Sequence, residues 1–411
     1  MSRFLQIHTL TSYPASLLNR DDAGFAKRIP FGDSTRTRVS SQCLKRHWRS
    51  FTGPESLRDA GAPMSVRSRI TLDHEVFRAL IADGVDEATA REVTEQVKNT
   101  LFGKSNQAKA KEEAAAEKKS KKGESAEESP EKAAGRTEQV TVLGRPEIEY
   151  FLTHARAVCA AKPALKDIKA RVEASFKDAR KNLEALRTGA GLDAALFGRM
   201  VTSDILARCD AAVHVAHAFT VHAELAETDY FSAIDELERE REDAQLGSGH
   251  IGTTELTSGL FYGYVAVDLP LLVSNIESCR AEDWRKADRT LAAEVTRRLV
   301  HMLATVSPGA KLGSTAPHGY AQAVCIEAGE AQPRTLANAF LHSVSVKGDP
   351  LENTYKALDA HLAEFDGMYG WDGRRAHAAM HAEGRLSAAR FGDKLTLPAL
   401  AKWAAGQVVE G

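Results

Sequence analysis

The chain has 411 residues, 43% of them hydrophobic, and carries 54 Lys and Arg against 56 Asp and Glu. That size allows two or three domains with sizeable cores, and the nearly neutral charge excludes a protein that is basic over its whole surface. The sequence contains no apolar run long enough for a membrane-spanning helix and no apolar signal core at its N-terminus, so neither is expected.

Charge is nevertheless uneven along the chain. Residues 1–58 hold ten Lys and Arg against four Asp and Glu, whereas residues 224–243 hold nine acids against two arginines. A basic face and an acidic segment in one chain allow head-to-tail self-association as well as binding to a polyanion. The five cysteines are scattered without a CxxC pair, which argues against disulfides or a zinc finger and fits a reducing cytoplasm.

The first predicted elements surround a basic strand-to-helix junction. Strands are predicted over Phe4–Thr11 and Thr35–Val39. A helix is predicted to begin after Ser40 or Ser41 and to end at Gly53-Pro54. Phosphates bind cations, hydroxyl donors and the exposed amides of a helix start, so the junction predicts a site for a nucleic-acid backbone. A solvated basic face without a ligand is the alternative. The residues concerned are Arg36, Arg38, Ser40, Ser41, Gln42, Lys45, Arg46 and Arg49.

A mainly helical module is predicted next, over residues 60–190. Residues 73–102 and 146–190 show helical spacing of apolar residues. Between them, residues 104–138 contain no Ile, Leu, Val or aromatic residue, and eight Lys mix with seven Glu up to Lys132. Such a composition cannot bury enough apolar surface to offset its ordering entropy, so a disordered insert is expected, with an exposed charged helix as the alternative.

The second half predicts strands followed by helices. Strands are expected over residues 210–224, towards the end of 247–269, and over Tyr320–Ile326 as the last strand. Helices are expected over residues 284–305, 336–344 and 353–365. This order predicts an α+β fold with a ferredoxin-like, RNA-recognition-type core.

Evidence for catalysis or for a cofactor is weak. His214, His217 and His222 lie close together, but no HExxH motif accompanies them, so structural histidines are favoured over a metal site. On a single strand His214 and His222 would share one face and His217 the other. The Gly-rich stretch before Leu260 has no GK[ST] and is not a phosphate-binding P-loop. The Ser-Pro-Gly-Ala-Lys loop can place Lys311 on a phosphate, and a plain connector fits it equally well.

A series of motifs runs in order from the N-terminus to about Phe340. They are FLQIHTL, LNRDD, RTRVSSQCLKR, GRM at residues 198–200, VAHAFTVH, DYF at residues 229–231, GTTELTSGLFY, HMLATVSPGAK and LANAF. In these motifs the chain resembles the CasC family, the repeated backbone subunit of the type I-E CRISPR Cascade, an RNA-guided surveillance complex. The insert 104–138 and the segment after residue 350 are the least similar parts.

The resemblance implies a hand-shaped fold. Residues 1–58, 191–224 and 259–411 would form an RNA-recognition-like palm, residues 59–190 helical fingers, and residues 225–258 a protruding thumb hairpin. Copies would stack along one guide RNA as a filament, and each thumb would interrupt that RNA at regular intervals by flipping a base outward.

The resemblance also implies roles for individual residues. Met200, Phe231 and Ser232 would hold the kink, because apolar side chains fill the gap left by an unstacked base. Lys27 and Arg28 would touch either the guide or the target duplex. The acidic run 236–243 is expected to meet a neighbouring copy near Arg36. The expected contacts to guide phosphates and riboses are Arg20, Arg38, Ser40, Gln42, Lys45, Arg46 and Arg49.

The expected function is non-enzymatic binding in antiviral defence. The chain would grip the phosphates of the guide CRISPR RNA without reading sequence, and pairing between guide and target DNA would supply specificity. Its partners would be the guide, the target DNA, other copies of itself and other Cascade subunits, with no membrane and no cofactor. The alternatives are a metal-assisted ribonuclease that uses His217 and His222, and an assembly scaffold that touches only protein.

Overall fold

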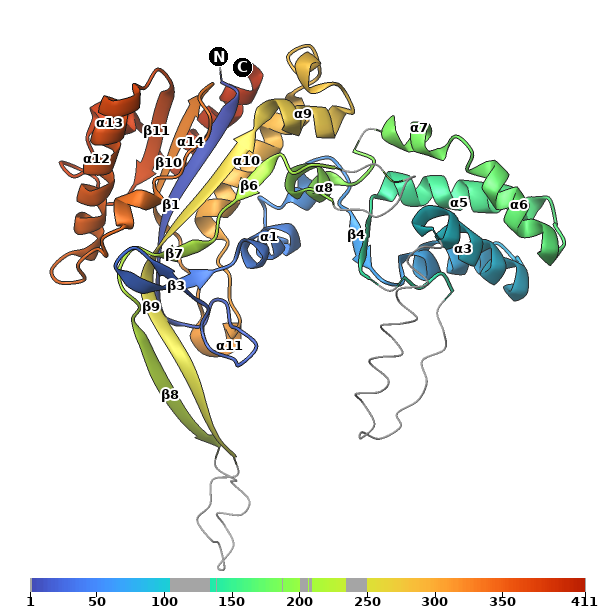
Figure 1. The fold of residues 1–411 in the computed structure, drawn as a ribbon, viewed down its shortest axis with the longest axis horizontal. Coiled ribbons are helices and arrows are strands. Elements are labelled where there is room, and N and C mark those ends of the chain that lie inside the picture. Colours follow the sequence, from blue (N-terminus) through green and yellow to red (C-terminus); the bar gives the residue numbers. More distant parts are fainter. Residues whose placement is uncertain are drawn as a thin grey trace, which may run out of the picture. The chain divides into compact units, whose positions relative to one another are not determined.

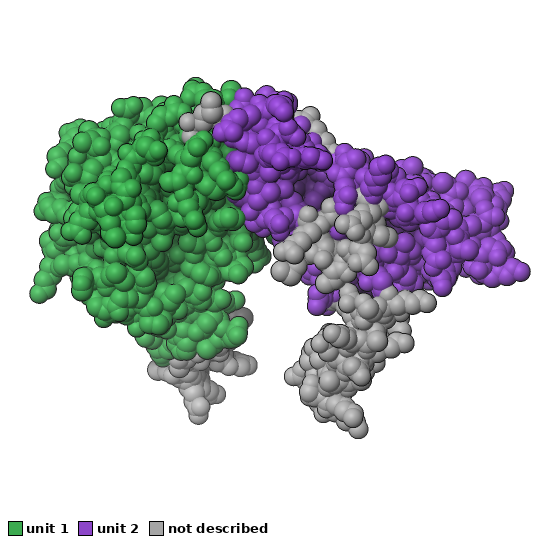
Figure 2. Space-filling model, turned by 45° about the horizontal axis from the view of Figure 1, so that its top comes forward, with its two compact units in different colours: residues 1–60, 213–269, 292–411 green, residues 61–212, 270–291 purple. Residues whose placement is uncertain are grey.

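A computed structural model describes residues 2–103, 134–137, 139–186, 188–199, 206, 209–233 and 250–410. The chain divides into two compact units, namely unit 1 (residues 1–60, 213–269 and 292–411) and unit 2 (residues 61–212 and 270–291), coloured separately in Figure 2. The expected mixture of helices with a large sheet is confirmed. The ferredoxin-like arrangement of the palm and the division into palm, fingers and thumb stay predictions.

Unit 1 is built on one sheet with the strand order β12-β11-β10-β1-β9-β7-β3-β2, and β6 and β8 also pair with β9 (Figure 1). The central strand β1 pairs antiparallel with both β9 and β10, and most of its first half is buried. Its strands are β1 (Phe4–Ser16), β2 (Arg28–Phe31), β3 (Ser34–Val39), β6 (Val213–Val215), β7 (Ala218–Thr220), β8 (Ala226–Ala233), β9 (His250–Asp268), β10 (Ala321–Gly329), β11 (Arg374–Ala379) and β12 (Asp393–Lys394).

Helices cover both faces of this sheet. Neighbouring residues of each strand point to opposite faces, so each strand packs side chains on both sides. On one face, Leu10 and Tyr262 pack in a core with Leu358 of α12. On the other face, Ile7 and Phe261 line a small cavity together with side chains of α1 and α10. The helices of unit 1 are α1 (Ser41–Ser50), α10 (Thr290–Thr305), α11 (Leu312–Thr315), α12 (Pro350–Tyr369), α13 (Ala388–Phe391) and α14 (Leu397–Glu410).

A long hairpin leaves this sheet. Strand β8 pairs antiparallel with the first half of β9, from Ala226 opposite Thr257 to Ala233 opposite His250. Figure 1 shows this hairpin extending beyond the ends of the other strands. It lies in the part of the sequence where a protruding hairpin was expected.

Unit 2 is mainly helical and has its own core. Val93 and Val97 of α3 pack with Phe151 of α5 and Ile168 of α6, and all four side chains are fully buried. A small two-stranded sheet, β4 (Val66–Ser68) with β5 (Thr141–Leu143), belongs to the same unit. The helices are a π-helical turn (Asp73–Phe77), α2 (Arg78–Ala82), α3 (Glu87–Phe102), α5 (Arg145–Ala160), α6 (Leu165–Ser175), α7 (Ala179–Glu184), α8 (Leu192–Phe197) and α9 (Leu269–Glu277).

Three expectations about elements are wrong. Tyr320–Ile326 lies at the start of β10 but is not the last strand, because β11 and β12 follow. Strand β11 reads RRAHAA, which lacks the branched and aromatic residues of a typical strand, and it forms by pairing with β10. Residues 210–224 form two short strands rather than one, and residues 336–344 contain only a 3-10 turn, Ala337–Phe340.

Two further expectations concern the charged insert and membrane-spanning helices. Residues 104–133 and Glu138 lie outside the described residues, so the disorder of the insert stays a prediction. Among the helices that the structure describes, none is both long and apolar enough to cross a membrane.

Candidate nucleic-acid interface

The strand-to-helix junction forms as expected, between β3 and α1. Ser40 is the N-cap: its backbone is extended, and its hydroxyl accepts a hydrogen bond from the Cys43 amide at 3.2 Å. The Ser40 amide in turn donates to the Asn19 side-chain oxygen at 2.9 Å. Trp48 is buried on the core side of α1. The cap and the tryptophan together fix the first turn of α1 and the direction in which its polar side points.

His217, from the connection between β6 and β7, completes the start of this helix. Its Nδ1 accepts from the Ser41 amide at 3.1 Å and lies 3.4 Å from Arg38 Nη1. An Nδ1 that accepts these bonds belongs to a neutral ring with its proton on Nε2. Burial, and after it the charges of Arg38, Lys27 and Lys45, lower the pKa of His217. Three cations from three segments therefore act on one point at a helix N-terminus, which is an arrangement that attracts an anion.

The remaining predicted contacts surround this point on the surface. Arg20, Gln42 and Arg46 are exposed, whereas Lys45 and Arg49 are partly buried along α1. Arg20 forms an isolated bridge with Ala26 that closes the loop before β2. Among the residues that the structure describes, no carboxylate lies within ion-pair distance of Arg20, Lys27, Arg38 or Arg46. The structure thus gathers the predicted residues of the junction, and their contact with RNA stays a prediction.

Arg36 is buried and structural, which corrects its expected place on the basic surface. Its side chain is fully inaccessible. Its guanidinium donates to the carbonyls of Val221 at 2.6 Å and Phe340 at 2.8 Å and pairs with Asp33 at 3.3 Å. The sequence could not show this, because Arg36 and Arg38 follow the same alternation. Arg36 itself is therefore not accessible to a neighbouring copy. The acidic run 236–243 lies outside the described residues, so its docking near Arg36 stays a prediction.

Arg28 is already paired within the chain. Its guanidinium contacts the carboxylates of Glu224 and Glu255, which lie at the base of the β8–β9 hairpin. Hydrogen bonding to Glu255 is the main cause that raises the pKa of Arg28. The expected contact of Arg28 with nucleic acid stays a prediction, but the geometry gives this residue a role in anchoring the hairpin. Lys27, in contrast, is half-buried beside the His217 cluster.

Phe231 and Lys311, predicted for different roles, lie together. The Phe231 ring is 42% exposed on β8. The Lys311 ammonium lies 5.6 Å from the centroid of that ring and donates a hydrogen bond to the Thr254 hydroxyl on β9. Met200 lies outside the described residues. Ser232 is paired opposite Ile251 in the hairpin, and its side chain is not described.

The histidines proposed for a ribonuclease are held in other ways. His222 is buried; its Nδ1 lies 2.7 Å from the Ala223 carbonyl, and its Nε2 accepts from the Leu260 amide at 3.1 Å. Both ring nitrogens of His222 are therefore occupied, as expected for a structural histidine. No group of three His, Cys, Asp or Glu that could hold a metal ion occurs in the described part of the chain. A ribonuclease that uses His217 and His222 stays a hypothesis.

Sequence reasoning missed the part that His217 plays at the junction. Its partner Ser41 lies 176 residues earlier in the chain, so no local motif joins the two. The pairing of Arg28 with Glu224 and Glu255 was missed for the same reason. The sequence did carry one signal for this pairing, the acid content of residues 224–243, since Glu224 of that segment pairs with Arg28.

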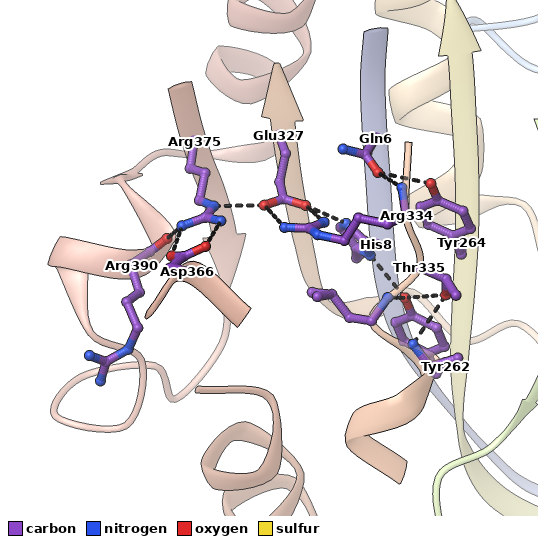
Figure 3. Close-up of polar contacts among 12 residues, drawn as sticks. Gln6, His8, Tyr262, Tyr264, Glu327, Arg334, Thr335, Asp366, Arg375 and Arg390 are labelled. Carbon is purple, nitrogen blue, oxygen red and sulfur yellow. Dashed lines mark hydrogen bonds and ion pairs between the residues drawn. The ribbon is translucent and has the colours of Figure 1, made fainter. Parts of the chain in front are cut away.

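A second group of arginines in unit 1 lies on the α12 face of the sheet, around the buried Glu327 (Figure 3). Arg334 pairs with both oxygens of Glu327, and Arg375 donates to it at 2.7 Å. His8 Nε2 lies 3.1 Å from the same carboxylate, and His8 Nδ1 lies 2.9 Å from the Tyr262 hydroxyl. The Glu327 side chain has no exposed surface.

This network joins the C-terminal part of unit 1 to its central strands. Arg375 also pairs with Asp366 of α12 at 2.5 and 2.7 Å. The Arg334 amide donates to the side-chain oxygen of Gln6 on β1 at 2.6 Å. Trp371 stacks on Arg375 at 4.2 Å. Each of these cations is neutralised within the fold, so the cluster is structural and is not part of the candidate interface.

Two solved structures and one family model match the chain over nearly its whole length. A solved structure titled "CRISPR RNA-guided surveillance complex, pre-nicking" matches with a TM-score of 0.73 and 26% identity, over 98% of this chain and 100% of the other. A second, titled "CRISPR RNA-guided surveillance complex", shares the fold with a TM-score of 0.64 and 23% identity, over 98% and 99% of the two chains. No curated protein matches the chain. The family model described as CT1975-like protein matches residues 5–403, so the chain belongs to the CT1975-like family of Cas proteins.

Proposed function

We propose that this chain is the non-catalytic backbone subunit of a type I-E CRISPR Cascade, in the manner of CasC. Several copies line one guide CRISPR RNA as a filament and hold its phosphates, and the guide pairs with target DNA in antiviral defence. Other Cascade subunits complete the assembly. The similarity to solved RNA-guided surveillance complexes over nearly the whole chain supports this proposal.

The observation that carries the proposal is the cluster at the start of α1. Lys27, Arg38 and Lys45 all act on His217, whose Nδ1 accepts from the first amide of the helix. Such a site can hold a phosphate by charge, because the cations and the positive end of the helix dipole both attract an anion. Binding of this kind is independent of sequence, as a subunit that must hold any guide requires.

The β8–β9 hairpin supplies the second part of the proposal. It projects from the same sheet and presents Phe231 as a partly exposed aromatic side chain. An exposed ring can stack on an unstacked base of any identity. In the proposed complex Phe231, with Met200 and Ser232, holds the guide in kinked segments.

The salt dependence of guide binding tests the phosphate contacts. Lys45→Ala with Arg49→Ala should lower the slope of log affinity against log salt by about two per copy, because each lost phosphate contact releases about one counterion fewer. The measurement is the affinity of the purified chain for guide RNA over a range of salt concentrations.

A matched pair of cations provides the control. Lys347 and Lys356 lie just before and within α12, which covers the sheet face opposite to α1. Lys347→Ala with Lys356→Ala removes the same charge and should leave the slope unchanged. Equal slopes for the two double variants would show that net charge alone, and not the junction, governs binding.

A further inference from the structure

The Phe231 ring lies in a slot that the opposite strand leaves open. Phe231 on β8 is paired directly with Gly252 on β9, so both residues face the same side of the hairpin. A Cβ atom built on Gly252 would lie 2.4 Å from Phe231 Cζ and 2.9 Å from Cε1. The ring therefore occupies the space that any other residue at position 252 would fill.

Lys311 closes this slot from a separate part of the chain. Thr254 lies two residues after Gly252 and so faces the same side of the hairpin. The Lys311 ammonium donates to the Thr254 hydroxyl and lies 5.6 Å from the centre of the Phe231 ring. That distance is within the range in which a cation is attracted to an aromatic face. One ammonium group thus contacts both strands of the hairpin.

The segment that carries Lys311 is tied to the body of unit 1. The Ala310 amide donates to the Leu17 carbonyl, just after β1, at 2.9 Å. The Gly309 amide donates to His47 Nε2 on α1 at 3.4 Å. Lys311 therefore joins the Phe231 slot to the helix that carries the cations of the candidate interface.

The other side of the hairpin is held by a different contact. Glu255 follows Thr254 and faces the opposite side, where it accepts from Arg28 and, at 3.0 Å, from the Ala26 amide. Lys311 and Arg28 thus contact neighbouring residues of β9, Thr254 and Glu255, on the two faces of the hairpin. Both are cations that the sequence had suggested as contacts to nucleic acid.

We propose that Lys311 is a positioning residue for Phe231: its ammonium, together with the open space at Gly252, fixes the orientation of the ring that inserts at each kink of the guide. The inference rests on the proposed function, since it assigns the residues that set the wedge of that function. It replaces the predicted phosphate contact of Lys311 with a contact inside the protein.

The test compares two measurements on the full chain assembled with guide RNA. The first is the slope of log affinity against log salt, which counts phosphate contacts. The second is the chemical reactivity of each guide base, which reports flipped positions as a periodic signal. Lys311→Met retains the aliphatic stem but loses the cation. It should weaken the periodic signal as Phe231→Ala does, while the salt slope stays within about half a unit of the wild-type value.

Three further variants sharpen the test. Gly252→Ala should weaken the periodic signal as well, because its methyl group displaces the ring. Lys311→Arg should restore the signal, since a guanidinium also stacks on an aromatic face. Lys311→Met combined with Phe231→Ala should be no worse than Phe231→Ala alone, because both changes act through the same ring.

Two results would overturn the inference. A Lys311→Met variant that keeps the periodic signal but lowers the salt slope by about one would make Lys311 a phosphate ligand. Wild-type assemblies without any periodic signal would remove the wedge itself, and with it the proposed kinked guide. The first result leaves the proposed function standing and the second does not, so the two failures can be told apart.

Discussion

Unit 1 contains two clusters of arginines that differ in whether a carboxylate neutralises them. Around Glu327, buried Arg375 and half-buried Arg334 are each neutralised by a carboxylate within the fold. At the start of α1, exposed Arg46 and half-buried Arg38 have no carboxylate within ion-pair distance among the described residues. A buried cation must be paired to be stable, whereas a surface cation without an acid partner is available to a phosphate. The presence of a carboxylate, more than the number of arginines, separates structural cations from binding ones.

Arg36 and Arg28 lie between these extremes and show how the rule applies. Arg36 belongs to the basic motif in sequence but is buried and bound to carbonyls. Arg28 is partly exposed, yet two glutamates neutralise it. Both are close in sequence to proposed phosphate contacts, and both have partners within the fold.

The largest effect is expected from breaking the buried cluster. Glu327→Gln removes the charge that Arg334 and Arg375 share, so Arg334 loses its carboxylate partner and Arg375 retains only Asp366. The loss of one partner of a buried pair costs about 3–5 kcal/mol of unfolding free energy. Chemical denaturation of the full chain, followed through the unit 1 transition, measures it. Glu383→Gln, which removes an exposed partner of Lys394, should change little, and equal effects of the two variants would contradict the account.

Acid should weaken the same cluster. Burial opposes the charge of Glu327, but hydrogen bonds from Arg334 and His8 outweigh it and lower the pKa of Glu327 below its usual 4.5. Burial lowers the pKa of His8 below its usual 6.5. Both groups therefore bind protons more readily in the unfolded state, so stability should fall as the pH drops, beginning near 6.5 with His8 and continuing below 4.5 with Glu327.

Thermal unfolding between pH 7.5 and pH 4 measures this dependence. The His8→Gln variant should show a flatter curve between about pH 6.5 and 5 than the wild-type chain, because the first titrating group is gone. A wild-type curve that is level across that range would show that His8 titrates alike in both states.

A matched pair of methionine substitutions separates structure from binding. Arg36→Met should lower the melting temperature by several degrees, because the carbonyls of Thr220, Val221 and Phe340 lose a buried donor. It should leave the salt slope of guide binding unchanged. Arg46→Met should lower that slope by about one and leave the melting temperature unchanged. The reverse pattern, with Arg36 governing the slope, would break the comparison between paired and unpaired cations.

A smaller effect is expected at His217. A bound phosphate would offset the charges of Arg38, Lys27 and Lys45 that help to lower the pKa of His217. Guide binding should then take up a proton, and affinity should rise several-fold as the pH falls from about 7 to 5.5. His217→Asn should remove most of that rise. An identical pH dependence in the variant would place the phosphate away from His217.

Much of the fold was predictable, because its main elements carry local signals. The N-cap at Ser40 and the apolar stripe of α1 marked the junction correctly. Strand β11 was not predictable, since a short run of Arg, Ala and His becomes a strand only through its pairing with β10. The split of residues 210–224 into β6 and β7 was missed because both strands depend on register with β9.

The candidate site also contains residues that local patterns predicted and residues that only contacts between distant segments revealed. Residues of the junction that are close in sequence, such as Ser40 and Arg46, were found from their pattern. The partners that come from elsewhere, such as His217 at the first amide of α1 and Thr254 beside Lys311, were not. Contacts between distant segments leave no spacing in the sequence, so the burial of Arg36 and the pairing of Arg28 could come only from the structure.

The most direct test of the central claim is the native mass of the chain co-expressed with a CRISPR array, with the bound RNA sequenced. The account predicts several copies on one guide RNA, and fewer copies retained at raised salt after Lys45→Ala with Arg49→Ala. A chain that purifies without RNA, or that carries RNA unrelated to the array in a single copy, would contradict it.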